Sequence, residues 1–102
     1  MLIDFDPGKD AANLSKHGVS LASAAELNWA ASLAWIDDRA DYGEVRIVAL
    51  APIGDRLFFV AFVDRNEVRR IIGLRRANRR EVNHYVGSIQ ENPGPDADIG
   101  GR

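Results

Sequence analysis

The segment that most constrains the fold of this 102-residue chain is Leu57–Val63, L-F-F-V-A-F-V, because every side chain in it is apolar. A strand with no polar face has to be buried on both sides, so we expect it at the centre of a sheet. Helices are expected over one face of that sheet. The other face then needs a cover as well, either from the remaining helix or from a second chain.

Further strands and helices follow from apolar periodicity and turn signals around this segment. Alternating apolar residues bounded by turns predict strands at 2–5, 33–37, 45–51 and 68–74. Helix signals predict helices at 7–17, at 21–29 and from Asn78 onward, with Asp6, Ser20 and Asn78 as N-caps and Glu81 as the capping-box partner of Asn78. The predicted apolar faces are Ala11 and Leu14, then Leu21, Ala24, Ala25 and Asn28, and finally Val82, Tyr85, Val86 and Ile89. The order β-α-α-β-β-β-β-α predicts an α+β fold with two N-terminal helices and one C-terminal helix.

Length and composition are typical of a single globular domain, with 46% hydrophobic and 27% charged residues. We place this domain at residues 1–90 and expect 91–102, rich in Gly, Pro and Asp, to be a flexible tail. The absence of cysteine excludes disulfides, thiolate catalysis and cysteine-based metal sites. The sequence has no signal-peptide pattern and no apolar run long enough to span a bilayer, so we expect a cytoplasmic protein without membrane contact.

Basic charge is concentrated in residues 65–80, which hold seven arginines against one acid, Glu67. The resulting local charge of +6 contrasts with the formal net charge of −2 of the whole chain. Four of these residues, Arg75, Arg76, Arg79 and Arg80, fall where the fifth strand gives way to the last helix, whose free N–H groups add positive potential. Arginine forks bind phosphate oxygens in pairs, so the pattern indicates a nucleic-acid site. The alternative is a solvated arginine-rich edge.

Two other features each have a functional and a plainer interpretation. His17 ends the first helix, where the helix dipole favours the protonated imidazole, so it is either a candidate acid or a cap for a free carbonyl. The carboxylates of loop 37–44 indicate either a magnesium site or a solvated loop paired with nearby arginines. Their spacing matches no fixed ligand pattern, and we expect no metal and no other cofactor.

Three blocks of the sequence resemble a known family. They read D-F-D-P…N-L-S-K-H-G-V-S at Asp4–Ser20, D-D-R-A-D-Y-G-E-V-R at Asp37–Arg46 and R-I-I-G-L-R-R-A-N-R-R-E…Y at Arg70–Tyr85. Their order and spacing over residues 3–85 resemble the BrnT toxins, the small ribonucleases of type II toxin–antitoxin pairs. Gly73 and Asn78 stand where that family usually has Ser and Thr.

The resemblance implies a RelE-like fold with a mainly antiparallel sheet and metal-independent cleavage of RNA. It also implies a hetero-oligomeric complex with a BrnA-like antitoxin, which neutralises the toxin and alone contacts operator DNA. The same arginines fit two other functions: a non-enzymatic nucleic-acid-binding or regulatory module, and an inactive heterodimerisation partner. Cleavage of RNA in the presence of EDTA separates the enzyme from both.

Metal-free RNA cleavage needs a base for the 2′-hydroxyl proton, cations for the pentacoordinate phosphate and an acid for the leaving 5′-oxygen. His84 lies one helical turn after Arg80, and Glu81, Tyr85 or an arginine would move protons if neither histidine did. The candidate catalytic residues are His17, Arg75, Arg79, Arg80 and His84. The candidate RNA-binding residues are Arg46, Arg65, Arg69, Arg70, Arg76 and Tyr85.

Overall fold

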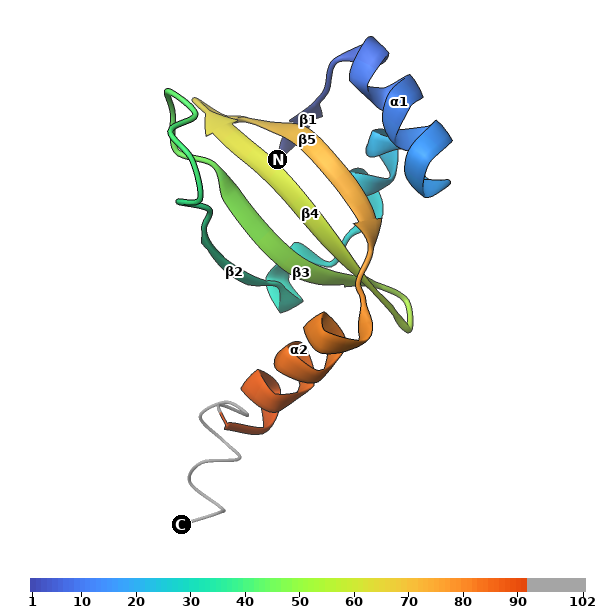
Figure 1. Cartoon of the computed structure of the whole chain (residues 1–102), viewed down its shortest axis with the longest axis vertical. Helices are drawn as coiled ribbons and strands as arrows, with labels where there is room; N and C mark the ends of the chain where they lie inside the picture. Colours follow the sequence, from blue (N-terminus) through green and yellow to red (C-terminus); the bar gives the residue numbers. More distant parts are fainter. Residues whose placement is uncertain (92–102) are drawn as a thin grey trace.

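The computed structural model describes residues 1–91, which form a five-stranded mixed sheet with two α-helices and two 3₁₀ helices (Figure 1). The strands are β1 (Leu2–Asp4), β2 (Leu33–Ile36), β3 (Ile47–Ile53), β4 (Arg56–Arg65) and β5 (Val68–Arg76). The helices are α1 (Pro7–His17), η1 (Leu21–Glu26), η2 (Trp29–Ala31) and α2 (Arg79–Glu91). The predicted α+β class is confirmed. The predicted tail lies outside the described residues, apart from Glu91, which ends α2.

The strand order is β1-β5-β4-β3-β2, so the all-apolar strand β4 is central, as its sequence predicts. The β1–β5 pair is parallel, and the other three neighbouring pairs are antiparallel. A bulge in the β4–β5 pairing lets Ile71 and Leu74 face the same core, although they are three residues apart. That core is 9% exposed or less throughout and comprises Leu21, Ala24, Leu27, Ala49, Ala51, Phe58, Val60, Phe62, Ile71 and Leu74.

The second predicted helix is wrong in type: residues 21–29 form the 3₁₀ helices η1 and part of η2 instead of one α-helix. Ser20 caps η1 as predicted, accepting a hydrogen bond from the Ala22 N–H. The buried residues are Leu21, Ala24 and Leu27, whereas Ala25 and Asn28 are exposed. A spacing of three residues lines side chains up along a 3₁₀ helix, which explains why this geometry replaces the α-helix over the sheet.

The first helix is capped as predicted but packs through a different face. Asp6 accepts a hydrogen bond from the Lys9 N–H, and Gly18 ends the helix in the left-handed region at φ 73°. The predicted apolar residue Leu14 is 51% exposed, and the residue turned inward is Asn13, which is 9% exposed. Polar contact with a strand edge, not apolar burial, therefore holds α1 in place.

Asn13 occupies the edge of β5 beyond the point where β1 ends. Its amide donates to the carbonyls of Leu74 (2.8 Å) and Val19 (2.9 Å) and accepts from the Leu74 N–H (3.3 Å). Strand β1 pairs with residues 68–70 of β5, so the main chain of Leu74 has no strand on this side. The Asn13 side chain thus satisfies strand hydrogen bonds that would otherwise be buried without partners.

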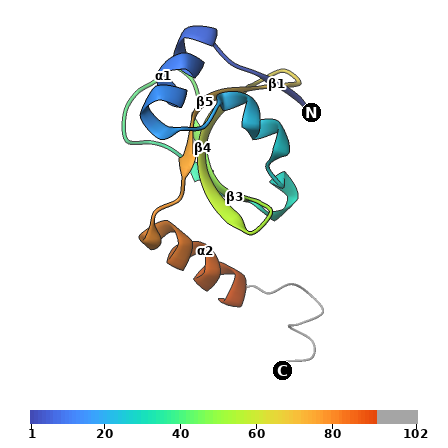
Figure 2. The ribbon, with the colours of Figure 1, turned by 90° about the vertical axis from the view of Figure 1, so that its right-hand side faces the viewer.

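Helix α2 extends beyond the end of the sheet instead of lying across a face, as Figures 1 and 2 both show. Helices η1 and η2 cover one face of the sheet. The opposite face, here called the open face, carries Trp35, Val48 and Phe59, which the pairing register places on one side. Helix α2 meets the rim of this face, and its predicted apolar stripe splits. Tyr85 turns inward, whereas Val82, Val86 and Ile89 are exposed.

Replacing Asn13 with Ala should lower the free energy of unfolding by about 1–3 kcal/mol, because it leaves the Leu74 main-chain groups unsatisfied. Urea unfolding measures this loss. The matched change Asn83→Ala, at an exposed position of α2, should alter stability by less than about 0.5 kcal/mol. Equal stabilities of the two variants would mean that water replaces Asn13 at the strand edge without cost.

Candidate nucleic-acid interface

The junction between β5 and α2 is built by a reciprocal cap. The Asn78 side chain accepts from the Glu81 N–H (2.8 Å), and the Glu81 carboxylate accepts from the Asn78 N–H (2.9 Å). This is the capping box that the sequence predicts, and it fixes the first turn of α2 directly after β5. The arginines on either side of Asn78 are therefore held at the positive end of a helix.

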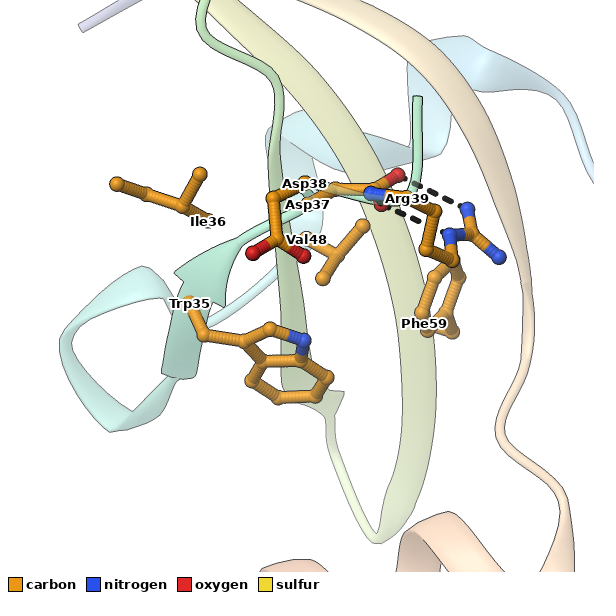
Figure 3. A pocket seen from close by; sticks show the side chains of 7 residues that line it. All are labelled: Trp35, Ile36, Asp37, Asp38, Arg39, Val48 and Phe59. Carbon is orange, nitrogen blue, oxygen red and sulfur yellow. Dashed lines mark hydrogen bonds and ion pairs between the residues drawn. The ribbon is translucent and has the colours of Figure 1, made fainter. Parts of the chain in front are cut away.

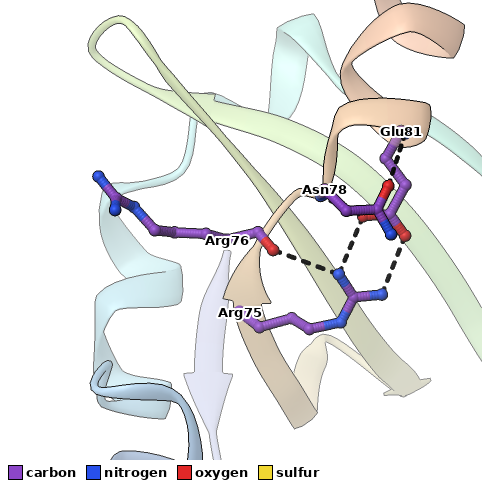
Figure 4. A network of polar contacts seen from close by, with 4 residues as sticks. All are labelled: Arg75, Arg76, Asn78 and Glu81. Carbon is purple, nitrogen blue, oxygen red and sulfur yellow. Dashed lines mark hydrogen bonds and ion pairs between the residues drawn. The ribbon is translucent and has the colours of Figure 1, made fainter.

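Arg75 is the most firmly held of these arginines. Its guanidinium makes two hydrogen bonds of 2.9 Å to the Glu81 carboxylate, donates to the Arg76 carbonyl and lies 4.1 Å from the Phe59 ring centre (Figure 4). The Arg75 side chain is half-buried, with 31% of it accessible. The ion pair and the aromatic contact fix the guanidinium on the open face before any ligand binds.

Arg76, Arg79 and Arg80 are exposed, and none of them forms an ion pair with another side chain of residues 1–89. Arg76 points away from Arg75 (Figure 4), because neighbouring side chains of a strand project to opposite faces. Arg79 and Arg80 belong to the first turn of α2. The free positive charge next to Arg75 therefore comes from the helix.

Three arginines predicted to bind RNA are paired with acids from elsewhere in the chain. Arg65 pairs with Glu44 (2.6 Å), Arg69 with Asp64 (2.8 Å) and Arg70 with Asp4 (2.7 Å). Arg69 also lies over the rings of Trp29 and Phe62. Acids pair with Arg65, Arg69, Arg70 and Arg75, whereas Arg76, Arg79 and Arg80 form no ion pair among residues 1–89. The RNA-binding role of the paired arginines stays a prediction.

Two of the four carboxylates of the acidic loop, Asp37 and Glu44, pair with arginines, as in the plainer interpretation. Arg39 makes two hydrogen bonds to Asp37, at 2.8 and 2.9 Å, and these bonds lower the pKa of the buried Asp37 carboxyl to about 2. Tyr42 also donates to Asp37, and Arg46 stacks on the Tyr42 ring at 3.7 Å. The buried Arg46 Nε has no hydrogen-bond partner among the described residues.

The two histidines lie at different edges of the sheet. The His84 ring contacts Trp35 of β2 edge-to-face, with the ring centres 5.9 Å apart. His17 lines a depression of about 330 Å³ beside Ile72 and Gly73 of β5. Strands β2 and β5 are three strand spacings apart, roughly 14 Å. His84 reaches the open face through its contact with Trp35, whereas His17 lies beside Ile72 and Gly73 among residues of α1.

Tyr85 has a structural partner. Its hydroxyl donates to the carbonyl of Ala31 at 2.6 Å, which ties α2 to η2. In the folded chain, the hydroxyl proton of Tyr85 is therefore engaged in this hydrogen bond. Tyr85 contributes to the site by placing α2, and with it His84, against the rim of the open face.

Sequence patterns missed a small depression on the open face. About 180 Å³ in volume, it lies between Trp35 and Phe59, with Val48 at its base and residues 37–39 at its rim (Figure 3). Trp35 is 42% exposed, which is unusual for so large an apolar side chain. The sequence places Trp35 two residues before the pair Asp37 and Asp38, which could have indicated a site. The opposite wall, Phe59, comes from β4 and is distant from Trp35 in the sequence.

Among the described side chains, no group of three or more His, Asp or Glu is placed to hold a metal ion. Within residues 1–91, no helix is both long and apolar enough to cross a bilayer.

The fold and this site define a small α+β protein with an immobilised arginine beside free arginines at a helix N-terminus. Comparison with family models adds that residues 5–81 match the family described as "Ribonuclease toxin, BrnT, of type II toxin-antitoxin system". The chain belongs to the BrnT family. Membership indicates a ribonuclease toxin with an RNA target and an antitoxin partner. A search of curated proteins found no match.

Glu81→Gln tests the ion pair that immobilises Arg75. The hydrogen bonds from Arg75 lower the pKa of Glu81, so the ionised carboxylate stabilises the folded chain above the ordinary carboxyl pKa of about 4.3. That stabilisation is lost as the pH falls through the folded-state pKa. We expect the stability difference between wild type and variant to be largest near neutral pH and to shrink in acid.

Urea unfolding from about pH 3 to about pH 7 measures this difference. The control Glu26→Gln, at the exposed end of η1, should show no such pH dependence. A wild-type advantage that stays constant over the whole range would contradict the ion pair as its source.

Proposed function

We propose that the chain is an endoribonuclease toxin that cleaves RNA without a metal ion at the start of α2. The observation that carries the proposal is the free pair Arg79 and Arg80 beside the immobilised Arg75. The proposal includes a RelE-like architecture for a single domain at residues 1–90 and a cytoplasmic site of action. It also includes a hetero-oligomer with a BrnA-like antitoxin, through which operator DNA is contacted.

The cleavage step uses the RNA's own 2′-hydroxyl. Its oxygen forms a bond to the neighbouring phosphorus as the bond from phosphorus to the 5′-oxygen breaks, which leaves a 2′,3′-cyclic phosphate and a 5′-hydroxyl. Negative charge builds on the pentacoordinate phosphate, and arginine forks lower its energy. Arg75 uses three N–H groups on Glu81 and the Arg76 carbonyl, so two of its five donors remain for the phosphate.

In this step the 2′-hydroxyl gives its proton to a base, and the leaving 5′-oxygen takes a proton from an acid. Proton transfer is assigned to His84. The lowered pKa of Glu81 and the pKa of about 2 of Asp37 make both carboxylates weak bases at neutral pH. His84 is exposed on α2, one turn after Arg80 and in contact with Trp35. His17, at the far edge of the sheet, stays the second candidate. His84 lies beyond the matched residues 5–81, so its role rests on geometry.

The antitoxin must compete with RNA for the same arginines. Val82, Val86 and Ile89 are exposed on α2 next to Arg79 and Arg80, which gives a helix with a basic first turn and an apolar stripe. A complementary inhibitor segment is acidic and amphipathic, with carboxylates on the arginines and apolar side chains on the stripe. Such a segment would block the phosphate site directly.

The double change Arg79→Ala and Arg80→Ala should lower kcat/KM for RNA cleavage in EDTA by about a hundredfold or more, since lost transition-state contacts of this kind are worth about 2–4 kcal/mol. The control Lys9→Ala removes an exposed charge from α1 and should keep full activity. Full activity of the double variant would overturn the site. Absence of cleavage by the wild-type chain in EDTA, with RNA binding retained, would favour the non-enzymatic module.

The same double variant has a second readout. Titration calorimetry with the antitoxin should give weaker binding than with the wild type, because the inhibitor's carboxylates lose their partners. Unchanged affinity, together with lost cleavage, would place the antitoxin on another surface.

His84→Gln should flatten one limb of the pH–rate profile near neutrality, because the titrating imidazole is removed while hydrogen bonding is kept. The matched change His17→Gln decides between the two imidazoles. A profile altered by His17→Gln and not by His84→Gln would move the proton transfer to the β5 edge. Two unaltered profiles would exclude imidazole chemistry.

A further inference from the structure

We propose that the depression between Trp35 and Phe59 is a binding pocket for one guanine base of the RNA. The inference rests on the proposed function, since it names the base bound next to the scissile phosphate. At about 180 Å³ the depression is smaller than the 300–1,000 Å³ usual for drug-sized ligands. It suits a single flat ring system.

The walls of the pocket are suited to stacking. Trp35 of β2 and Phe59 of β4 flank Val48 of β3, so three neighbouring strands supply one apolar surface. Aromatic side chains exposed in this way bind unstacked bases through their faces, as at typical single-strand sites. The neighbouring sheet residues Leu50 and Val60 are fully buried, which keeps the surface rigid.

The rim of the pocket carries one donor group and one acceptor group. Arg39 is held by two hydrogen bonds to Asp37, yet 75% of its side chain is accessible, so its remaining N–H groups are available to a ligand. Figure 3 shows the Asp37 carboxylate turned toward Arg39 and the Asp38 carboxylate turned toward Trp35. Among the side chains of residues 1–89, none forms a hydrogen bond or an ion pair with the Asp38 carboxylate.

Guanine is the base whose edges match this rim. Its N1–H and N2–H groups are adjacent donors that one carboxylate accepts together, and its O6 and N7 are adjacent acceptors for an arginine fork. Adenine and cytosine offer the Asp38 carboxylate an amino group beside a repelling ring-nitrogen acceptor. Uracil offers a single N–H between two carbonyls. The free carboxylate of Asp38 therefore selects guanine.

The pocket shares two residues with the cleavage site. Phe59 lines the pocket and lies under the Arg75 guanidinium, and Trp35 lines the pocket and contacts His84. A base held between these rings places its own backbone beside Arg75, His84 and the first turn of α2. Guanine binding would thus decide which phosphodiester meets the arginines.

Nuclear magnetic resonance tests the pocket without any cleavage. The chain has two tryptophans, and the indole N–H of Trp29 is bonded to the Ala24 carbonyl, so Trp29 serves as an internal reference for Trp35. We expect 5′-guanosine monophosphate to shift the Trp35 signal at lower concentration than the adenosine, cytidine and uridine monophosphates. The Trp29 signal should stay in place. Equal responses to all four nucleotides, or none, would overturn the proposal.

Asp38→Asn tests the selecting carboxylate and should weaken guanosine monophosphate binding about tenfold or more. The control Asp55→Asn makes the same change at an exposed turn between β3 and β4 and should leave binding intact. Unchanged binding by Asp38→Asn would overturn the assignment of Asp38. If the chain cleaves RNA without guanine selectivity, the proposed guanine pocket is refuted and the proposed ribonuclease function stands. If the chain binds guanosine monophosphate but cleaves no RNA, the proposed ribonuclease function is refuted and the pocket stands.

Discussion

The apolar character of both faces of β4 is the constraint on which the rest of the structure depends. Helices η1 and η2 cover one face, and the buried ring of Phe58 together with Val60 and Phe62 forms the core there. On the open face Val48, Leu50, Ala61 and Val63 are buried as well, but Trp35 is exposed there, and α2 meets only the rim and extends away from the sheet (Figure 1). Aromatic surface and immobilised charge therefore remain accessible on one side of an otherwise closed sheet, and the candidate site lies on that side.

Local interactions were the part of the fold that the sequence predicts well. The caps of α1 and α2 depend on residues three positions apart, and Asp6, Asn78 and Glu81 all act as expected. The central position of β4 follows from its composition alone. The predicted start of the third strand at Val45 is two residues early, because the loop continues to Ile47 and leaves Val45 exposed.

Interactions between distant residues were the part that could not be predicted. Arginines of the basic stretch look free in the sequence, but Arg65 meets an acid 21 residues away and Arg70 one 66 residues away. The pocket between Trp35 and Phe59 could not be predicted for the same reason, since only the pairing of strands β2, β3 and β4 brings these two residues together. Asn13 looked like a polar surface residue because its partner, the Leu74 main chain, carries no signal in the sequence.

The parallel pairing of β1 with β5 also bears on how the protein is made. The first strand in the chain pairs with the last one, so the main-chain pairing of β1 and the contact of Asn13 in α1 with Leu74 cannot form until β5 is synthesised. Contacts over such separations are formed late because loop closure costs entropy. Helix α2 follows β5, so the arginine cluster is completed later still. For most of its own synthesis the chain therefore lacks both the β1–β5 pair and the arginines of the β5–α2 junction, which are present only once residues 68–80 have been made.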